Sequence, residues 1–106
     1  MNYNADEIDK QLHRKNAPPI SVTLAASGWT GSAVPYSQTV TAEGITADDY
    51  PILVSQLADG ATEDTQKAYN KAFGIVAAGT GITGDGTVTF KVYKKPETDI
   101  VVGLKL

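Results

Sequence analysis

The fold is decided by the stretch TVTFKVY at residues 87–93, in which apolar side chains alternate with threonine and lysine. A period of two is typical of a strand that buries one face. The stretch IVVGLKL at residues 100–106 repeats this alternation after a short loop that contains Pro96. The two stretches are predicted to pair as an antiparallel hairpin, whose apolar side must be covered by the rest of the chain.

Three more strands are predicted upstream, over residues 20–26, 34–42 and 51–57. Pro35 indicates an edge position for the second of them, and Pro51 fits the first position of the third, because proline cannot donate to a sheet ladder.

An amphipathic helix is predicted next, capped by Thr62 and closed by Gly74, followed by a short strand over residues 75–78 and a glycine-rich turn. The expected fold class is mainly β (α+β): an antiparallel β-sandwich-like domain of about six strands with one packed helix.

The N-terminal segment is predicted to form a separate short helix over residues 4–15. Its apolar positions are few, at Ala5, Ile8 and Leu12, and this stripe is too narrow for a core helix. We therefore expect it to dock either on its own domain or on another chain, as an attachment or oligomerisation segment, with a homotrimer among the alternatives. The sequence NAPP at residues 16–19 ends the helix as a stiff hinge. The predicted organisation is thus residues 1–19 as helix and hinge, and residues 20–106 as a β-rich globular domain.

Composition excludes several classes of function. A chain of 106 residues holds one domain, and the absence of cysteine removes disulfides and thiolate metal ligands. A net charge of −3 with scattered basic residues disfavours nucleic-acid binding. No apolar run approaches the roughly 18–20 residues that span a bilayer, and the first residues are polar and acidic, unlike a secretory signal. A soluble protein made in the cytoplasm, without membrane insertion, is expected.

No reactive constellation is predicted. GTGITG at residues 79–84 matches the dinucleotide-binding pattern, but Asp85-Gly86 and a strand follow it where that motif needs a helix. His13 is the only histidine and is expected on an exposed helix end. Asp48 and Asp49 fit a turn better than a cation site. We therefore predict no catalytic, cofactor-binding or metal-binding residues, and no enzyme.

Aromatic side chains in the loops offer the alternative function. Trp29 and Tyr50 lie in loops of the predicted strands, where exposed aromatic rings commonly bind sugars or proteins. A carbohydrate-binding module that uses these two residues is the alternative prediction. The competing interpretation places Trp29 over one end of the sheet as a core residue, and Tyr36 is expected in the core.

Three stretches of this sequence resemble a small module of phage and prophage structural proteins. They are VTLAASGW at residues 22–29, PYSQTV at 35–40 and GITADD at 44–49. The resemblance continues through PILV at 51–54, the predicted helix and the final strands, and so covers about residues 20–106.

Such modules occur in tail-fibre, baseplate or head-fibre proteins, often after a short helical segment. The resemblance implies a virion component that is made in the bacterial host cytoplasm and acts in assembly or host-surface attachment. The implied partners are other virion proteins or copies of the same chain, with a host-surface glycan as a further alternative. It implies no catalytic residues. The long repetitive stalk of a fibre protein is missing from this chain, which fits a minor decoration or adaptor protein.

Overall fold

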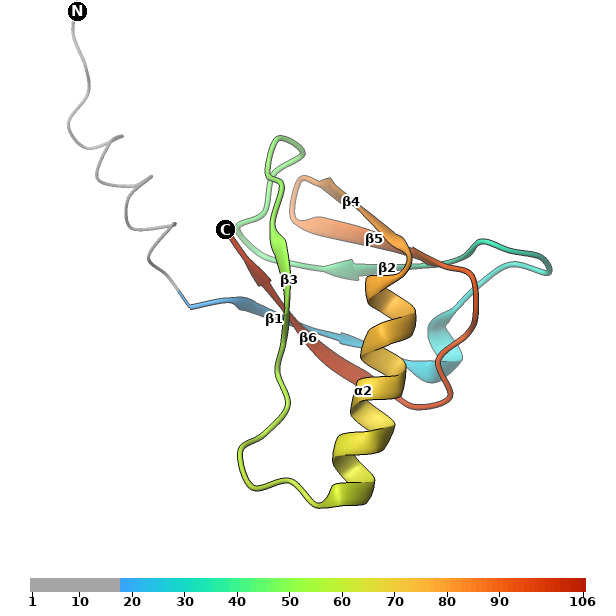
Figure 1. Ribbon diagram of the computed structural model, residues 1–106. Helices are drawn as coiled ribbons and strands as arrows, with labels where there is room; N and C mark the ends of the chain where they lie inside the picture. The colour runs from blue at the N-terminus through green and yellow to red at the C-terminus, as the bar shows by residue number, and fades with distance from the viewer. Residues whose placement is uncertain (1–17) are drawn as a thin grey trace, which may run out of the picture.

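The computed structural model describes residues 18–106 and contains six strands and one long helix (Figure 1). In chain order the elements are β1 (Ile20–Leu24), the 3-10 helix η1 (Ala26–Gly28), β2 (Tyr36–Thr41), β3 (Ile52–Ser55), α2 (Glu63–Ala77), β4 (Thr80–Gly84), β5 (Thr87–Val92) and β6 (Ile100–Lys105). The helix predicted over residues 4–15 lies outside the described residues, as do Ala5, Ile8, Leu12 and His13.

The strands form two antiparallel sheets of three strands each, in the orders β1-β6-β3 and β2-β5-β4. We call them sheet A and sheet B. Their inner faces and one side of α2 share a single core, in which Leu24, Val92 and Val102 are the largest fully buried side chains. The β-rich, sandwich-like fold with one packed helix is therefore confirmed.

The predicted pairing of the last two strands is wrong. β5 and β6 lie at the centres of different sheets, and β5 pairs with β4 and β2, whereas β6 pairs with β1 and β3. The alternation of apolar residues identifies the buried face of a strand but not its neighbours. The tight turn at Asp85-Gly86, with Gly86 at φ 76°, instead joins β4 to β5 as a hairpin.

The boundary between α2 and the strand that follows also differs from the prediction. Residues 75–77 continue the helix instead of forming a strand, because Ala72 and Val76 are four residues apart on one helical face and both are buried. Thr62 does cap the helix, since its hydroxyl accepts a hydrogen bond from the Thr65 N–H at 3.2 Å. The glycine-rich stretch predicted as a turn contains β4.

The two sheets meet along one side and are open along the other. β1 and β2, the edge strands on the closed side, are joined by the side chain of Gln38, which hydrogen bonds the backbone of Ala25. β3 and β4 are the edge strands of the open side, and α2 connects them in the chain. Figure 1 shows α2 lying against the sheets, with its last turn leading into β4. Within residues 18–106, no helix is long and apolar enough to cross a membrane.

Candidate functional site

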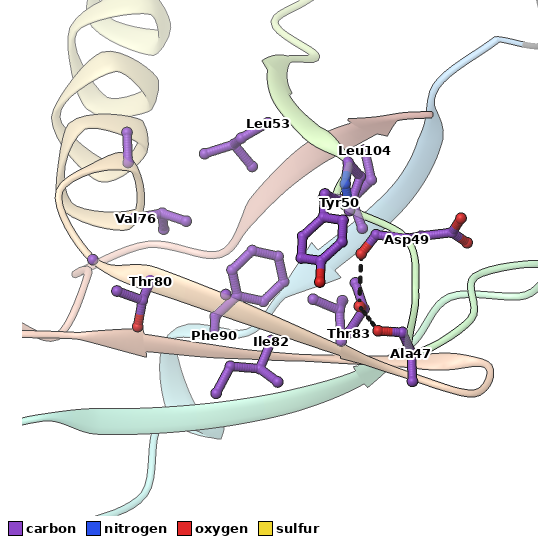
Figure 2. Close-up of a pocket in the computed structure, with 15 residues that line it drawn as sticks. Ala47, Asp49, Tyr50, Leu53, Val76, Thr80, Ile82, Thr83, Phe90 and Leu104 are labelled. Carbon is purple, nitrogen blue, oxygen red and sulfur yellow. Dashed lines mark hydrogen bonds between the residues drawn. The ribbon is translucent and has the colours of Figure 1, made fainter. Parts of the chain in front are cut away.

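A hollow of about 480 Å³ occupies the open side of the sandwich (Figure 2). It is bounded by β3, by β4, by the end of α2 and by the loop that precedes β3. Its lining consists of Ala47, Asp49, Tyr50, Pro51, Leu53, Val76, Ala77, Gly79, Thr80, Gly81, Ile82, Thr83, Val88, Phe90 and Leu104. These residues come from four strands, the helix, the loop before β3 and the connection between α2 and β4, so the hollow exists only in the folded domain.

The floor of the hollow is apolar because two sheets and a helix turn core residues toward it. Phe90 from β5, Leu104 from β6 and Val76 from α2 are each buried, and the half-buried Leu53 completes the floor from β3. The gap above Phe90 follows from the sequence of β4. Gly81 is the residue of β4 that pairs with Phe90, and it carries no side chain to fill the space. A Cβ at Gly81 would lie 3.9 Å from the Phe90 ring, at ordinary contact distance.

The rim of the hollow is exposed and also apolar. Tyr50 at the rim is 93% exposed. Ile82 pairs with Thr89, which faces outward between the buried Val88 and Phe90, so the side chain of Ile82 lies on the outer face of sheet B (Figure 2). Ala77, at the end of α2, is exposed as well. An exposed apolar rim around an apolar floor is the surface that binding partners commonly cover.

The loop that carries Tyr50 is fixed to the β4–β5 hairpin. The Thr83 hydroxyl donates to the Asp49 carbonyl at 2.9 Å, as the dashed lines in Figure 2 show. The Ala47 N–H donates to the Asp85 carboxylate at 3.3 Å, and the Thr46 N–H donates to Asp49 Oδ2 at 2.8 Å. Tyr50 is therefore presented by an ordered loop, which lowers the entropy that binding would cost.

Charged residues of both signs occur at or beside the lining. Asp49 is in the lining, Asp48 and Asp85 belong to the loop and the turn beside it, and Lys105 of β6 follows the lining residue Leu104 and pairs with Ile52. Within residues 18–106, no group of three or more His, Cys, Asp or Glu residues could hold a metal ion. The chemistry that the hollow offers is thus the binding of apolar groups.

The two aromatic residues predicted as a ligand platform lie in different environments. Trp29 is 5% exposed and belongs to the core, so its ring presents no surface to a sugar, whereas Tyr50 projects into solvent. Tyr36 packs partly buried against the core beneath Lys95, whose ammonium lies 4.8 Å from its ring centre. The predicted platform of Trp29 and Tyr50 is therefore reduced to Tyr50.

The glycine pattern at residues 79–84 is explained by packing. Gly79 precedes β4 where the chain crosses β5 closely, and an added Cβ would collide with the Lys91 carbonyl. The pattern is followed by a turn and a strand, and no helix begins at its end. The sequence alone did not predict the hollow. The pattern that could have indicated it is Gly81, a glycine on the inner face of an edge strand, paired with Phe90.

Comparisons with protein-family models, with curated proteins and with solved structures found nothing that matches this chain.

Proposed function

We propose that this chain is a non-enzymatic structural protein of a phage or prophage virion, a tail, baseplate or fibre component that acts in assembly or host-surface attachment. It would be made in the bacterial host cytoplasm and incorporated into the particle. The observation that carries the proposal is the hollow between β3 and β4, an apolar binding surface with a fixed loop at its rim. A surface of this kind suits the contacts by which assembly proteins hold one another.

The resemblance to phage structural modules supports the proposal through residues with clear structural roles. Gly28 and Gln38, from the first two matching stretches, form the closed side of the sandwich. Asp49, from the third, supports the loop that carries Tyr50. The stretches that resemble the module are therefore those that shape the domain and its rim, as expected for a module defined by its scaffold.

The location is tested on particles. Prophages are induced in a bacterial strain that carries the gene, particles are purified by density gradient, and their proteins are identified by mass spectrometry. We expect peptides of this chain to band with the major capsid or tail proteins. A chain that stays in the soluble fraction, while the particle proteins band normally, would contradict the proposal.

The surface is tested in the same particles with two tyrosine variants. Tyr50→Asp places a charge on the rim of the hollow and should reduce incorporation on the order of tenfold. Tyr93→Asp is the matched control, because Tyr93 is also exposed, at 62%, but does not line the hollow. Equal incorporation of the two variants would remove the hollow from the proposal.

A carbohydrate-binding module remains the second candidate, and the exposure of Tyr50 favours it. A single aromatic ring beside an aspartate could stack on one sugar face. A glycan array probed with wild type, Tyr50→Ala and Tyr93→Ala tests this function. Binding that only Tyr50→Ala loses would establish it, and no binding by the wild type would end it.

A further inference from the structure

The hydrogen bonds of β5 show which backbone groups of β4 face the open side. The Ala42 N–H donates to the Gly86 carbonyl at 2.8 Å, so Gly86, the residue before β5, bonds toward the β2 side. Successive residues of an antiparallel strand direct their N–H and C=O groups to opposite sides, so Thr89, three residues later, bonds toward β4. Its partner there is Ile82. Ile82 and every second residue of β4 counted from it therefore bond β5.

The residues between them, Gly81 and Thr83, direct their backbone N–H and C=O groups away from β5, to the free edge of sheet B. Within residues 18–106 these groups have no backbone partner. Edge strands commonly avoid pairing by means of lysine, proline or a bulge, and β4, with the sequence TGITG, contains none of these. The free edge of β4 is thus open to a further strand.

Ile82 is the exception on the outer face of sheet B. It is 57% exposed, and it is the only large apolar side chain among the outward-facing residues of β2, β4 and β5, which the structure describes in full. The other outward-facing residues are Ser37, Thr39, Thr41, Thr80, Gly84, Thr87, Thr89 and Lys91. This apolar side chain lies on the edge strand, midway between the two residues whose backbone groups are unpaired.

We propose that β4 pairs with β4 of a second copy of this chain, antiparallel and around a twofold axis at Ile82, so that sheet B continues from one copy into the other. In this register Gly81 of each copy faces Thr83 of the other, and both pairs exchange their outward N–H···O bonds. Ile82 meets its own copy in a pair without backbone hydrogen bonds, where side chains come closest. An isologous contact of this kind closes as a dimer. The inference goes beyond the proposed function and does not rest on it.

The apolar area beside the edge indicates how strong this contact is. The Thr83 hydroxyl donates to the Asp49 carbonyl at 2.9 Å, which places the exposed Tyr50 beside the edge. A tyrosine ring can bury roughly 150–250 Å². Two such rings, two Ile82 side chains and the paired strands bring the contact toward the lower limit of specific interfaces, about 1,200 Å² in total. We therefore expect a weak dimer that dissociates on dilution.

The register can be tested with a disulfide because the chain contains no cysteine. In the proposed pairing the two Ile82 Cα atoms lie roughly 4.5 Å apart, within the range that a disulfide bridges. Ile82→Cys should therefore form a covalent dimer under mild oxidation. Thr80→Cys is the matched control on the same exposed face of the same strand, because its two copies would lie about 14 Å apart. Cross-linking of Thr80→Cys as fast as Ile82→Cys would overturn the proposal.

Light scattering on the full chain gives the second readout. Wild type should show a mass above the monomer that falls on dilution. Gly81→Pro removes an outward N–H but no bond to β5, as edge strands tolerate, and should raise the dissociation constant at least about tenfold. Gly81→Ala is the matched control, since its Cβ would lie 3.9 Å from the Phe90 ring and its N–H is kept. It should leave the dissociation constant unchanged.

Circular dichroism shows whether Gly81→Pro is folded. If it is not, Ile82→Lys carries the test, because it places two like charges opposite each other at the axis, whereas Thr80→Lys does not. Ile82→Lys should weaken the dimer and Thr80→Lys should not. A wild type that is monomeric at all concentrations would overturn the proposal. So would equal dissociation constants for Gly81→Ala and a folded Gly81→Pro.

Discussion

The side-chain amide of Gln38 forms two hydrogen bonds with the backbone of Ala25, one from the Ala25 N–H to Oε1 and one from Nε2 to the Ala25 carbonyl, both 3.0 Å long. Gln38 belongs to sheet B, whereas Ala25 directly follows the last residue of β1 in sheet A. The amide thus takes the place of a backbone peptide group and extends pairing from one sheet to the other. Gln38 is the only buried polar side chain among the described residues, at 9% exposed.

Gln38→Leu should destabilise the domain by about 1–3 kcal/mol, because leucine fills similar space but leaves both Ala25 groups without their partners. The control is Thr39→Val, on the neighbouring residue that faces outward and whose hydroxyl bonds Thr89 at 2.7 Å on the exposed surface. That change should cost less than about 1 kcal/mol. Urea unfolding measures both, and equal midpoints for the two variants would contradict the role of Gln38.

Gly28→Ala should act through the same amide. A Cβ on Gly28 would lie 2.6 Å from Gln38 Oε1, so the side chain of Gln38 must move and its bonds to Ala25 must stretch or break. The double variant with Gln38→Leu tests this coupling in a double-mutant cycle. We expect the double variant to cost clearly less than the sum of the two single changes. Additive costs would show that Gly28 serves some other purpose.

Tyr69 from α2 connects two strands of sheet A where their direct pairing stops. Its hydroxyl accepts from the Gln56 N–H at 2.8 Å and donates to the Val101 carbonyl at 2.7 Å. Tyr69→Phe removes both bonds and should lower the free energy of unfolding by about 1–3 kcal/mol. Tyr93→Phe is the control, since the exposed Tyr93 should tolerate the change. The melting temperatures of the two variants, measured at the same protein concentration, are compared; only Tyr69→Phe should melt at a clearly lower temperature than wild type.

Trp29 provides a spectroscopic test of the fold, because it is the only tryptophan in the chain. Its ring is buried, and no hydrogen-bond partner for Nε1 lies within residues 18–106. We expect blue-shifted fluorescence, weak quenching by iodide, and a red shift on unfolding. Strong quenching in the folded protein would contradict the buried position and restore Trp29 as a candidate for ligand binding.

Features that depend on neighbouring residues in the sequence were predicted correctly, whereas features that depend on distant segments were not. Alternation in residues 87–93 correctly gave a strand and its buried face, and Thr62 marked the helix start, because both signals are local. Partner choice depends on the whole chain, and β5 and β6 were wrongly paired for that reason. β4 escaped prediction because glycines at 81 and 84 hide the strand pattern. The hollow was not predicted either, because the residues that line it come from segments distant in sequence.

The position of Tyr50 at the rim depends on Thr83, whose hydroxyl donates to the Asp49 carbonyl and also lies 3.4 Å from the Ala47 carbonyl. Thr83→Val keeps the shape and the β-branching of the side chain, and therefore the strand, but removes the donor. We expect faster amide hydrogen exchange in residues 46–50 with a stability loss below about 1.5 kcal/mol. Thr89→Val on the outer face should leave exchange in that loop unchanged. If Thr83→Val also leaves it unchanged, the loop is held by Asp85 and the turn, and the ordering of Tyr50 must be attributed to them.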